Sequence, residues 1–300
     1  MFNKYKFRCH YQGSLISVPN PLTANQLEML FDYRKRGLGE GKQLTPKQEQ
    51  VWHSLEHKEE ETKNYSLTNT AKGLCAEIVF AERYGRRKSL NLKQFEKGLA
   101  TEKAGRDLLS SYINELLISD EEIRSNEWVV GKRDIKHDEL IIDIKSSFDF
   151  QSFSKKRLET NYEYNFRQVD SYMDIWKIKQ SMLAYVLIDT PERIIEDELR
   201  RSDWKNDIFD MNGTARDSKI QIIKDIVNEH LFTKKGLDEF CQQSSSVQVE
   251  WFDDFVEIPQ NERIHIVEHK FDKARIEQRN NCLTLCRNLM NEINNKYQKK

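Results

Sequence analysis

The sequence predicts a mixed fold of the α/β (α+β) class, preceded by an N-terminal helical extension. Apolar residues recur at the spacing of helical faces over much of the first 117 residues, and after that point the period changes to two in short runs rich in isoleucine and valine. Polar helical segments follow, and chains that mix helices and strands in this way fold as α/β or α+β proteins. We expect residues 1–62 to form the extension and residues 63–300 the main domain.

Three helices are predicted in the first part of the chain. The first covers residues 22–37 and begins after a capping threonine. Three of its apolar residues share one face: Leu27, Leu30 and Phe31. The second covers residues 44–61, where a threonine cap is followed by a proline at the first helical position. The third covers residues 66–85 and ends at a glycine, a common helix terminator.

A fourth helix, predicted from Phe95 to Leu117, has one unusual position. Its stripe at three- and four-residue spacing comprises Leu99, Glu102, Arg106, Leu109, Ile113 and Leu116. Glu102 therefore falls where the pattern expects an apolar residue, and glutamate is rarely buried unless it is paired or bound to another group. An ion pair with Arg106, four residues further on, is one explanation. A functional ligand is the other.

The extended segments lie in the second half of the chain. Four strands are predicted, at residues 127–134, 139–147, 181–189 and 263–271. We expect the first two to lie side by side across a short turn. A segment with a helical rhythm, residues 162–178, separates the second strand from the third, and a long helix from Asp272 to Tyr297 ends the chain.

The composition is that of an ordinary globular protein of 300 residues, with a net charge of −1 and five cysteines. No apolar run approaches the ~20 residues needed to span a bilayer, and the N-terminus lacks the apolar centre of a secretory signal. We therefore expect a cytoplasmic protein that does not enter a membrane. The odd, scattered cysteines argue against a disulfide framework, and Cys282 and Cys286, one helical turn apart, are interpreted as small core residues.

Charge is unevenly spread along the chain. Between residues 82 and 106, eight basic residues oppose three acidic ones, which gives a local net charge of +5. The basic residues are Arg83, Arg86, Arg87, Lys88, Lys93, Lys97, Lys103 and Arg106. A solvated helix face is the ordinary meaning of such a cluster. Beside a phosphate-cleaving site, it would instead attract a nucleic acid.

The strand at residues 139–147 carries the most distinctive pattern. Asp143 and Lys145 are two residues apart and therefore point to one face, while Ile142 and Ile144 point to the other. If the preceding strand pairs with this one, Asp134 joins them, and the repulsion between two carboxylates is most readily relieved by a divalent cation. Such a cation could bind a scissile phosphate. The alternative is a salt bridge on a solvated sheet face.

Four short motifs follow one another in a specific order. They are Gly98-x-x-x-Glu102 on a helix, Gly131-x-x-Asp134, Asp143-x-Lys145 on the next strand, and Gln168-x-x-x-Tyr172 on the following helix. Together they resemble the PD-(D/E)XK nuclease superfamily, and within it the RecB-like phage exonucleases of the lambda-exonuclease and YqaJ-like viral recombinase type. The resemblance covers about residues 63 to 297. It implies a restriction-endonuclease-like core in which helices flank a mixed central sheet.

The resemblance implies a metal site at these motifs. Asp134 and Asp143 would ligate Mg²⁺ or Mn²⁺, with the carbonyl oxygen of Ile144 as a further ligand. Glu102 would complete the metal shell directly or through a water molecule. Lys145 would act on the attacking water and neutralise charge on the phosphate.

Further positions are expected to orient these groups or to bind DNA. Gln168 would orient the lysine or a phosphate, and Tyr172 would support its helix or contact DNA. Arg106, Lys155 and Lys156 are expected to bind DNA phosphates, although a solvated loop explains the two lysines equally well. Aromatic side chains between residues 148 and 166 could stack on unpaired bases, with core packing as the alternative.

Two positions depart from the superfamily pattern. Arg133 precedes Asp134 where the superfamily name has proline, and Asp143 stands where glutamate is commoner. Aspartate is one methylene shorter than glutamate, so the metal must lie nearer to the strand. This departure bears on the choice of metal more than on activity.

The resemblance implies a metal-dependent deoxyribonuclease, an exonuclease that digests linear double-stranded DNA in phage or prophage recombination. An endonuclease with the same site, used in restriction, defence or the processing of branched DNA, is a second hypothesis. A DNA-binding module without catalysis is a third, although every acidic and lysine position of the motifs is present.

The same resemblance bears on partners and cofactors. It implies DNA as the substrate, a phage single-strand annealing protein as a partner, and a homo-oligomer. An iron–sulfur cluster is not expected, because the cysteine spacing does not suit one. ATP is not expected either, because the sequence lacks a Walker loop.

Overall fold

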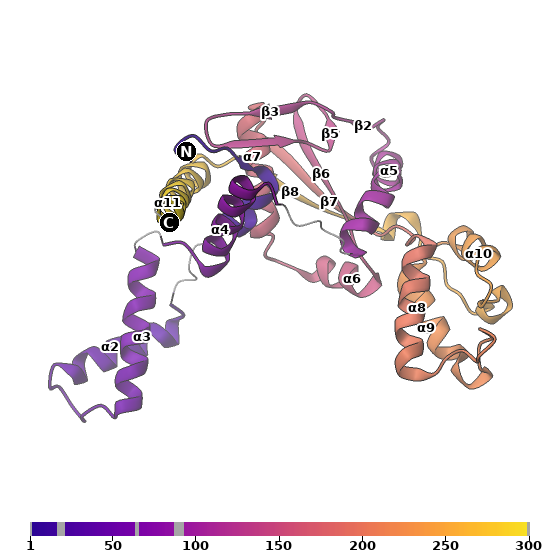
Figure 1. Cartoon of the computed structure of the whole chain (residues 1–300), viewed down its shortest axis with the longest axis horizontal. Helices are drawn as coiled ribbons and strands as arrows, with labels where there is room; N and C mark the ends of the chain where they lie inside the picture. The colour runs from indigo at the N-terminus through magenta and orange to yellow at the C-terminus, as the bar shows by residue number, and fades with distance from the viewer. Residues whose placement is uncertain (1, 17–21, 64–65, 87–92, 299–300) are drawn as a thin grey trace.

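The computed structural model describes residues 2–16, 22–63, 66–86 and 93–298 (Figure 1). Helices and strands are mixed along the chain, which confirms the predicted α/β class. Figure 1 shows a central sheet with helices against it, a helical hairpin that extends away on one side, and a group of helices on the other. Arg87 and Lys88 of the predicted basic cluster lie outside the described residues.

Three strands form the central sheet, in the order β6, β7, β8. β6 (Leu140–Ser146) runs parallel to β7 (Gln180–Val186), and β7 runs antiparallel to β8 (Ile264–Lys270). The sheet is therefore mixed. Its strands correspond to three of the four predicted extended segments.

Helices cover both faces of this sheet. α5 (Lys93–Ile113) packs on one face, where its Leu109 joins an apolar cluster with Ile142. Gly105 lets the helix approach closely, since a Cβ there would lie 3.2 Å from a methyl group of Val186. α7 (Glu163–Trp176) covers the opposite face, and α6 (Phe150–Leu158) packs beside it against β7.

The buried face of α5 differs from the predicted stripe. It consists of Lys97, Thr101, Gly105, Leu108 and Leu109. Glu102 is exposed. The prediction was wrong because it took apolar side chains as the mark of the buried face, whereas polar groups with partners occupy it. Thr101 Oγ1 and Ser146 Oγ share a hydrogen bond of 2.8 Å, and Lys97 Nζ donates to the carbonyl oxygen of Phe148 at 2.8 Å.

Two small sheets contain the other short strands. β4 (Val129–Lys132) lies between β1 (Phe7–Arg8) and β3 (Ile123–Ser125), and β5 (Ile135–Lys136) pairs with β2 (Ile118–Ser119). The predicted pairing of residues 127–134 with residues 139–147 is therefore wrong. β4 already has a strand on each side, so it is not available to β6.

Residues 2–16 contribute buried side chains to the main core. A turn of 3-10 helix (Cys9–Tyr11) and α1 (Gln12–Leu15) follow β1, and their buried side chains pack against α4 (Asn69–Tyr84), α7 and α11 (Lys273–Gln298). The division of the chain into an extension of residues 1–62 and a main domain of residues 63–300 stays a prediction.

The helical hairpin of Figure 1 consists of α2 (Ala24–Gly37) and α3 (Pro46–Lys63). Thr23 and Gln26 cap α2 with reciprocal hydrogen bonds. A small apolar cluster joins the two helices: Leu22, Leu30 and Leu55. Leu27 and Phe31, which were predicted to share the face of Leu30, are exposed, because a single partner helix buries only a narrow stripe.

The group of helices on the other side of Figure 1 contains α8 (Glu192–Asn206), α9 (Ile220–His230) and α10 (Lys234–Gln243). It has an apolar cluster of its own, whose members include Ile195, Leu199, Ile223, Val227, Leu237 and Phe240. The sequence predicted polar helices in this region but not a second core.

Two further expectations concern the cysteines and membranes. Cys282 and Cys286 are buried on α11 in the main core together with Cys75 of α4, as predicted. Throughout the described ranges, each helix is too short or too polar to cross a membrane.

Candidate active site

β6 presents an acidic and a basic side chain side by side. Asp143 and Lys145 point to the face covered by α7, while Ile142 and Ile144 pack toward α5, which confirms the two faces predicted from the sequence. Lys145 Nζ lies 2.9 Å from Asp143 Oδ2, and the Asp143 side chain is only 1% exposed. A buried carboxylate is therefore paired with a lysine that keeps some contact with solvent.

Asp134 reaches the same place from the loop between β4 and β5. Its Oδ2 accepts a hydrogen bond of 3.0 Å from the backbone N–H of Ile144. The N–H and C=O of one residue in an extended strand point to the same side, so the carbonyl oxygen of Ile144 is also on the side of Asp134. Asp134 thus lies next to β6 without any strand pairing.

The charge of Asp143 affects the ionisation of Asp134. Desolvation and the nearby charge of Asp143 raise the pKa of Asp134 to about 7, although Lys145 acts in the opposite direction. Apart from its ion pair with Lys145, the buried Oδ2 of Asp143 accepts no hydrogen bond from the part of the chain that the structure describes. The site therefore has more negative charge than its own residues neutralise.

Gln168 of α7 connects the acidic and basic groups. Its Nε2 donates to Asp143 Oδ1 and to the Tyr172 hydroxyl, both at 3.1 Å, and its Oε1 accepts from Lys145 Nζ at 3.2 Å. The donor side of the amide thus faces the carboxylate and the acceptor side faces the ammonium group. Tyr172 is 5% exposed, so it supports Gln168 from within the core and offers little surface to DNA.

The donor set suits a small divalent cation. Mg²⁺ is commonly held by one or two carboxylates together with water and substrate phosphates, and Asp134, Asp143 and the Ile144 carbonyl could supply the protein ligands. Among the described residues, no three His, Cys, Asp or Glu side chains are gathered closely enough to form a metal site alone. Glu102 is exposed on α5, and its charge contributes to the raised pKa of Asp134. Its ligation stays a prediction.

Arg133, which precedes Asp134, is held inside the protein. Its Nε donates to Asp120 Oδ2 at 2.6 Å, and its Nη1 donates to the carbonyl oxygen of His137 at 2.6 Å. Burial alone would raise the pKa of Asp120, but the hydrogen bond from Arg133 brings it below its ordinary value. A buried ion pair therefore fixes the loop of Asp134, at the position where a proline would fix it through its ring.

The N-terminal segment forms one wall of the site, which the sequence did not reveal. A Cβ on Gly131 would lie 2.7 Å from Cys9 Sγ and from a ring carbon of Tyr172, so only glycine fits between them. His10 interacts electrostatically with the site. Desolvation lowers its pKa, and the positive charges of Arg8 and Lys145 lower it further. The glycine of the Gly131-x-x-Asp134 motif was the one signal that could have found this contact.

The predicted DNA-binding residues differ in their exposure to solvent. Arg106 is half-buried on α5, and Lys155 is exposed on α6. Lys156 forms an ion pair with Glu159 and lies over the ring of Tyr185. Two aromatic residues of the 148–166 segment are exposed, Phe150 and Tyr164, whereas two others are buried in the core, Phe153 and Tyr162.

Comparisons with known proteins bear on the fold. No protein-family model matches the sequence, and no curated protein matches it. A phage-related exonuclease from Haemophilus somnus 129PT is similar in structure over 98% of this chain and 97% of its own, with a TM-score of 0.59 and 18% identity. An alkaline exonuclease from Laribacter hongkongensis covers 77% of this chain and 86% of its own, with a TM-score of 0.48 and 10% identity. Its complex with dAMP has a TM-score of 0.46 and 11% identity. The chain therefore has the fold of a phage-related exonuclease over almost its whole length.

Proposed function

We propose that the chain is a metal-dependent deoxyribonuclease with a PD-(D/E)XK core, which digests linear double-stranded DNA from an end. The fold shared with a phage-related exonuclease supports the nuclease class and the exonucleolytic mode. Mg²⁺ or Mn²⁺ is the cofactor that the acidic pair suits. Phage recombination is the setting in which we expect this activity, with a single-strand annealing protein as partner.

One observation carries the proposal. The Gln168 amide bridges Asp143 and Lys145, and Asp134 accepts a hydrogen bond from the backbone N–H of Ile144, which lies between them on β6. A salt bridge on a solvated face, the alternative from the sequence, would leave both partners in water. Asp143 is instead buried, with a second carboxylate beside it. Burying like charges together opposes folding, so the arrangement is best explained by a bound cation and by catalysis.

Lys145 is expected to act as a charged hydrogen-bond donor. Burial alone lowers its pKa, but the charges of Asp143 and Asp134 outweigh that effect, so the pKa of Lys145 is raised overall. Its ammonium group is therefore protonated at neutral pH and donates to the attacking water or to a phosphate oxygen. Gln168 fixes its direction, and a preorganised donor of this kind stabilises the charge that develops on the phosphate.

The acidic residues would hold the cation. Asp134, Asp143 and the carbonyl oxygen of Ile144 are the proposed ligands, with Glu102 contributing directly or through water. When bound, a divalent cation supplies charge stabilisation at the phosphate and lowers the pKa of a water molecule. Asp134 must be ionised to bind it, and with a pKa of about 7 it is only partly ionised at neutral pH in the metal-free protein.

Residues around the site would guide the DNA. We propose that Arg106 and Lys155 contact phosphates, as basic side chains commonly do in complexes with DNA. Lys156 would join them when a phosphate replaces its present partner, Glu159. Phe150 and Tyr164 are exposed aromatic rings available for stacking on unpaired bases.

The test is digestion of an end-labelled linear duplex and of a covalently closed circle with the same sequence. Each substrate is incubated with Mg²⁺, with Mn²⁺ and with EDTA. Three proteins are compared: the wild type, Lys145→Ala, and Lys270→Ala, which removes an exposed lysine at the end of β8. We expect the linear substrate alone to be degraded, only with metal, with a loss of about 10²- to 10³-fold in Lys145→Ala and none in Lys270→Ala.

Each alternative result has a defined meaning. Cutting of the circle would make the protein an endonuclease with the same site. Cleavage that resists EDTA, or that survives Lys145→Ala, would mean that the group around Asp143 is not the working centre. The absence of any cleavage, together with retained DNA binding, would favour a DNA-binding module.

A further inference from the structure

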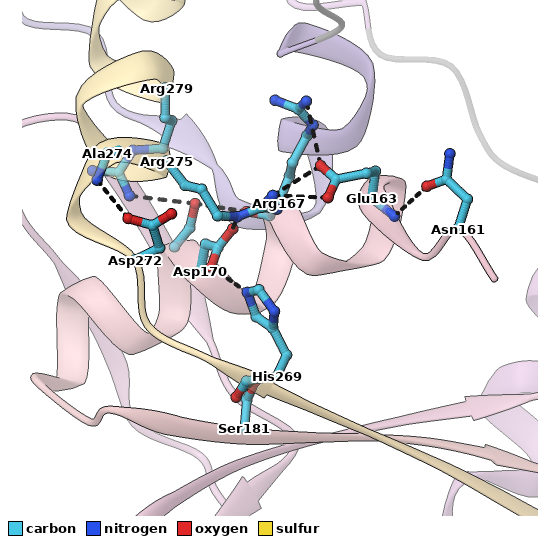
Figure 2. A network of polar contacts seen from close by, with 11 residues as sticks. Asn161, Glu163, Arg167, Asp170, Ser181, His269, Asp272, Ala274, Arg275 and Arg279 are labelled. Atoms are coloured by element: carbon cyan, nitrogen blue, oxygen red, sulfur yellow. Dashed lines mark hydrogen bonds and ion pairs between the residues drawn. The ribbon is translucent and has the colours of Figure 1, made fainter.

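α7 carries Gln168 on the face toward β6 and three charged residues, Glu163, Arg167 and Asp170, on another side. Figure 2 shows these three residues together with side chains of β8 and α11. Asp170 lies at the centre of the network and is 3% exposed. It is two residues from Gln168, so the two side chains leave the same turn of the helix in different directions.

Each carboxylate oxygen of Asp170 has its own partner. Oδ1 lies 2.7 Å from Nε2 of His269 on β8, and Oδ2 accepts from Nε of Arg275 on α11 at 2.7 Å. Because an ionised carboxylate only accepts hydrogen bonds, the shared proton belongs to His269 Nε2. Arg275 Nη1 in turn donates to both carboxylate oxygens of Glu163, at 2.8 and 2.9 Å, and so holds the first turn of α7 (Figure 2).

The contact with His269 ties α7 to the sheet that carries the candidate active site. β8 pairs with β7, and β7 pairs with β6, on which Asp143 and Lys145 lie. The imidazole of His269 is itself held in place, since it stacks on the Phe166 ring at 4.1 Å between centroids. Two contacts thus hold α7 against the sheet: Gln168 with residues of β6, and Asp170 with His269 of β8.

Stability alone is a weak explanation for this network. Taking several charges out of water is costly, and buried ion pairs can often be replaced by apolar residues of similar volume without loss of stability. What such pairs provide is a defined geometry. The hydrogen bonds of Gln168, at 3.1 to 3.2 Å, are already near the upper limit of ordinary length, so a small shift of α7 would break them.

We infer that Asp170, together with His269, is a positioning residue that holds Gln168 against Asp143 and Lys145. The inference rests on the proposed nuclease function, because it assigns Asp170 a role in that reaction. Asp170 touches neither substrate nor metal and acts only through Gln168. Groups that orient the ligands of a site in this way typically contribute 10- to 100-fold to activity.

The kinetic test compares two aspartates of α7. Asp170→Asn keeps the volume but removes the charge that the His269 N–H requires. Asp174→Asn is the matched control, since Asp174 is also paired with an arginine of α11, Arg279 at 2.7 Å, but has no link to β8. We expect Asp170→Asn to lower kcat about 10- to 100-fold with little change in KM, and Asp174→Asn to leave kcat within about threefold of the wild type.

Two further variants separate positioning from a loss of structure. His269→Gln keeps an N–H donor near the position of Nε2 and should retain most of kcat, whereas His269→Ala should behave like Asp170→Asn. In a Gln168→Ala background, Asp170→Asn should cause no further loss, because the residue through which it acts is gone. Additive losses, or equal losses in the Asp170 and Asp174 variants, would overturn the inference.

A readout that does not need catalysis keeps the two proposals distinguishable. In protein labelled with ¹⁵N-glutamine, the side-chain amide signal of Gln168 can be assigned from its disappearance in Gln168→Glu. Asp170→Asn should move this signal toward that of solvent-exposed glutamines, and Asp174→Asn should leave it in place. If the wild type cleaves no DNA, the proposed function fails, but the amide signal still decides the positioning role. An unmoved signal in Asp170→Asn would overturn it.

Discussion

Two charged clusters lie on different sides of α7, and they differ in how their charges are neutralised. On the side of β6, Asp134 and Asp143 lie beside Lys145, and apart from its ion pair with this lysine Asp143 Oδ2 accepts no hydrogen bond within the described chain. On the other side, three carboxylates are each paired with an arginine of α11 or α7: Glu163, Asp170 and Asp174. The first cluster has two carboxylates and one lysine, so it can take up a cation and, with it, a phosphate. The second is balanced and therefore suits a fixed framework.

Asp134 and Asp174, one carboxyl group from each cluster, differ in the direction of their pKa shifts. Desolvation and the charge of Asp143 raise the pKa of Asp134 to about 7. Asp174 is also affected first by desolvation, but hydrogen bonds and charge from Arg279 lower its pKa below the ordinary value. The folded protein thus favours the protonated form of Asp134 and the ionised form of Asp174.

The largest effect that would sharpen this comparison is expected from Asp143→Asn. The substitution removes a proposed metal ligand and the partner of Lys145, so DNA cleavage should fall about 10³- to 10⁴-fold, while circular dichroism shows a folded protein. Initial rates on the linear duplex measure the effect. Asp138→Asn, in the exposed turn before β6, is the control. A loss of less than tenfold would mean that Asp143 is not part of the site.

In the cluster of Glu163, Asp170 and Asp174, substitutions are expected to change stability more than activity. Arg279 is 1% exposed and bonds to Asp174 at 2.7 Å. Arg279→Ala therefore empties a buried position and leaves the partly buried Asp174 carboxylate with only Asn126 and Lys177 as partners among the described residues. The free energy of unfolding should drop by about 3–5 kcal/mol, as measured with urea. Lys273→Ala, on the same helix, removes an exposed ion pair with Glu277 and should change little. Equal effects of the two variants would contradict the structural role of the network.

Asp134→Asn should stabilise the metal-free protein, by on the order of 2 kcal/mol at pH 8. The raised pKa means that the folded state keeps the Asp134 proton longer than the unfolded state does. Below about pH 4 Asp134 is protonated in both states and does not lower the free energy of unfolding. As the pH rises toward about 7, the unfolded state releases the proton first, so the free energy of unfolding falls. Urea unfolding in EDTA from pH 4 to 8 should show a gap between variant and wild type that widens with pH. A gap that does not change with pH would show that the pKa of Asp134 is not raised.

Two glycines give the smallest expected effects, with opposite signs. Gly131→Ala would place a methyl group against Cys9 and Tyr172 beside the site, and should destabilise the protein by about 1 kcal/mol or more. Gly98→Ala, on α5, meets no atom within 4 Å and should stabilise it by about 0.5–1 kcal/mol. Thermal unfolding of both variants checks the signs. A destabilised Gly98→Ala would indicate a contact at the first motif that the structure does not show.

Parts of the site with a local pattern were predictable. The alternation of β6 placed Asp143 and Lys145 on one face, and the helical spacing of Gln168 and Tyr172 placed both on one side of α7. The stripe of α5 was not predictable, because polar residues with buried partners occupy it. Lys97 is 1% exposed and donates to the backbone carbonyl oxygen of Phe148. No periodic pattern in the sequence predicts this contact.

The sequence by itself determined the mixed fold class, the faces of β6 and the order of the four motifs, because these depend on backbone geometry over a few residues. Only the tertiary structure decided which distant segments meet. β1 lies beside β4, Asp134 bonds to β6 from a loop and not from a paired strand, and Asp170 finds partners 99 and 105 residues away. Such contacts result from the packing of whole elements, and a hydrogen bond between distant residues imposes no period on the sequence around either of them.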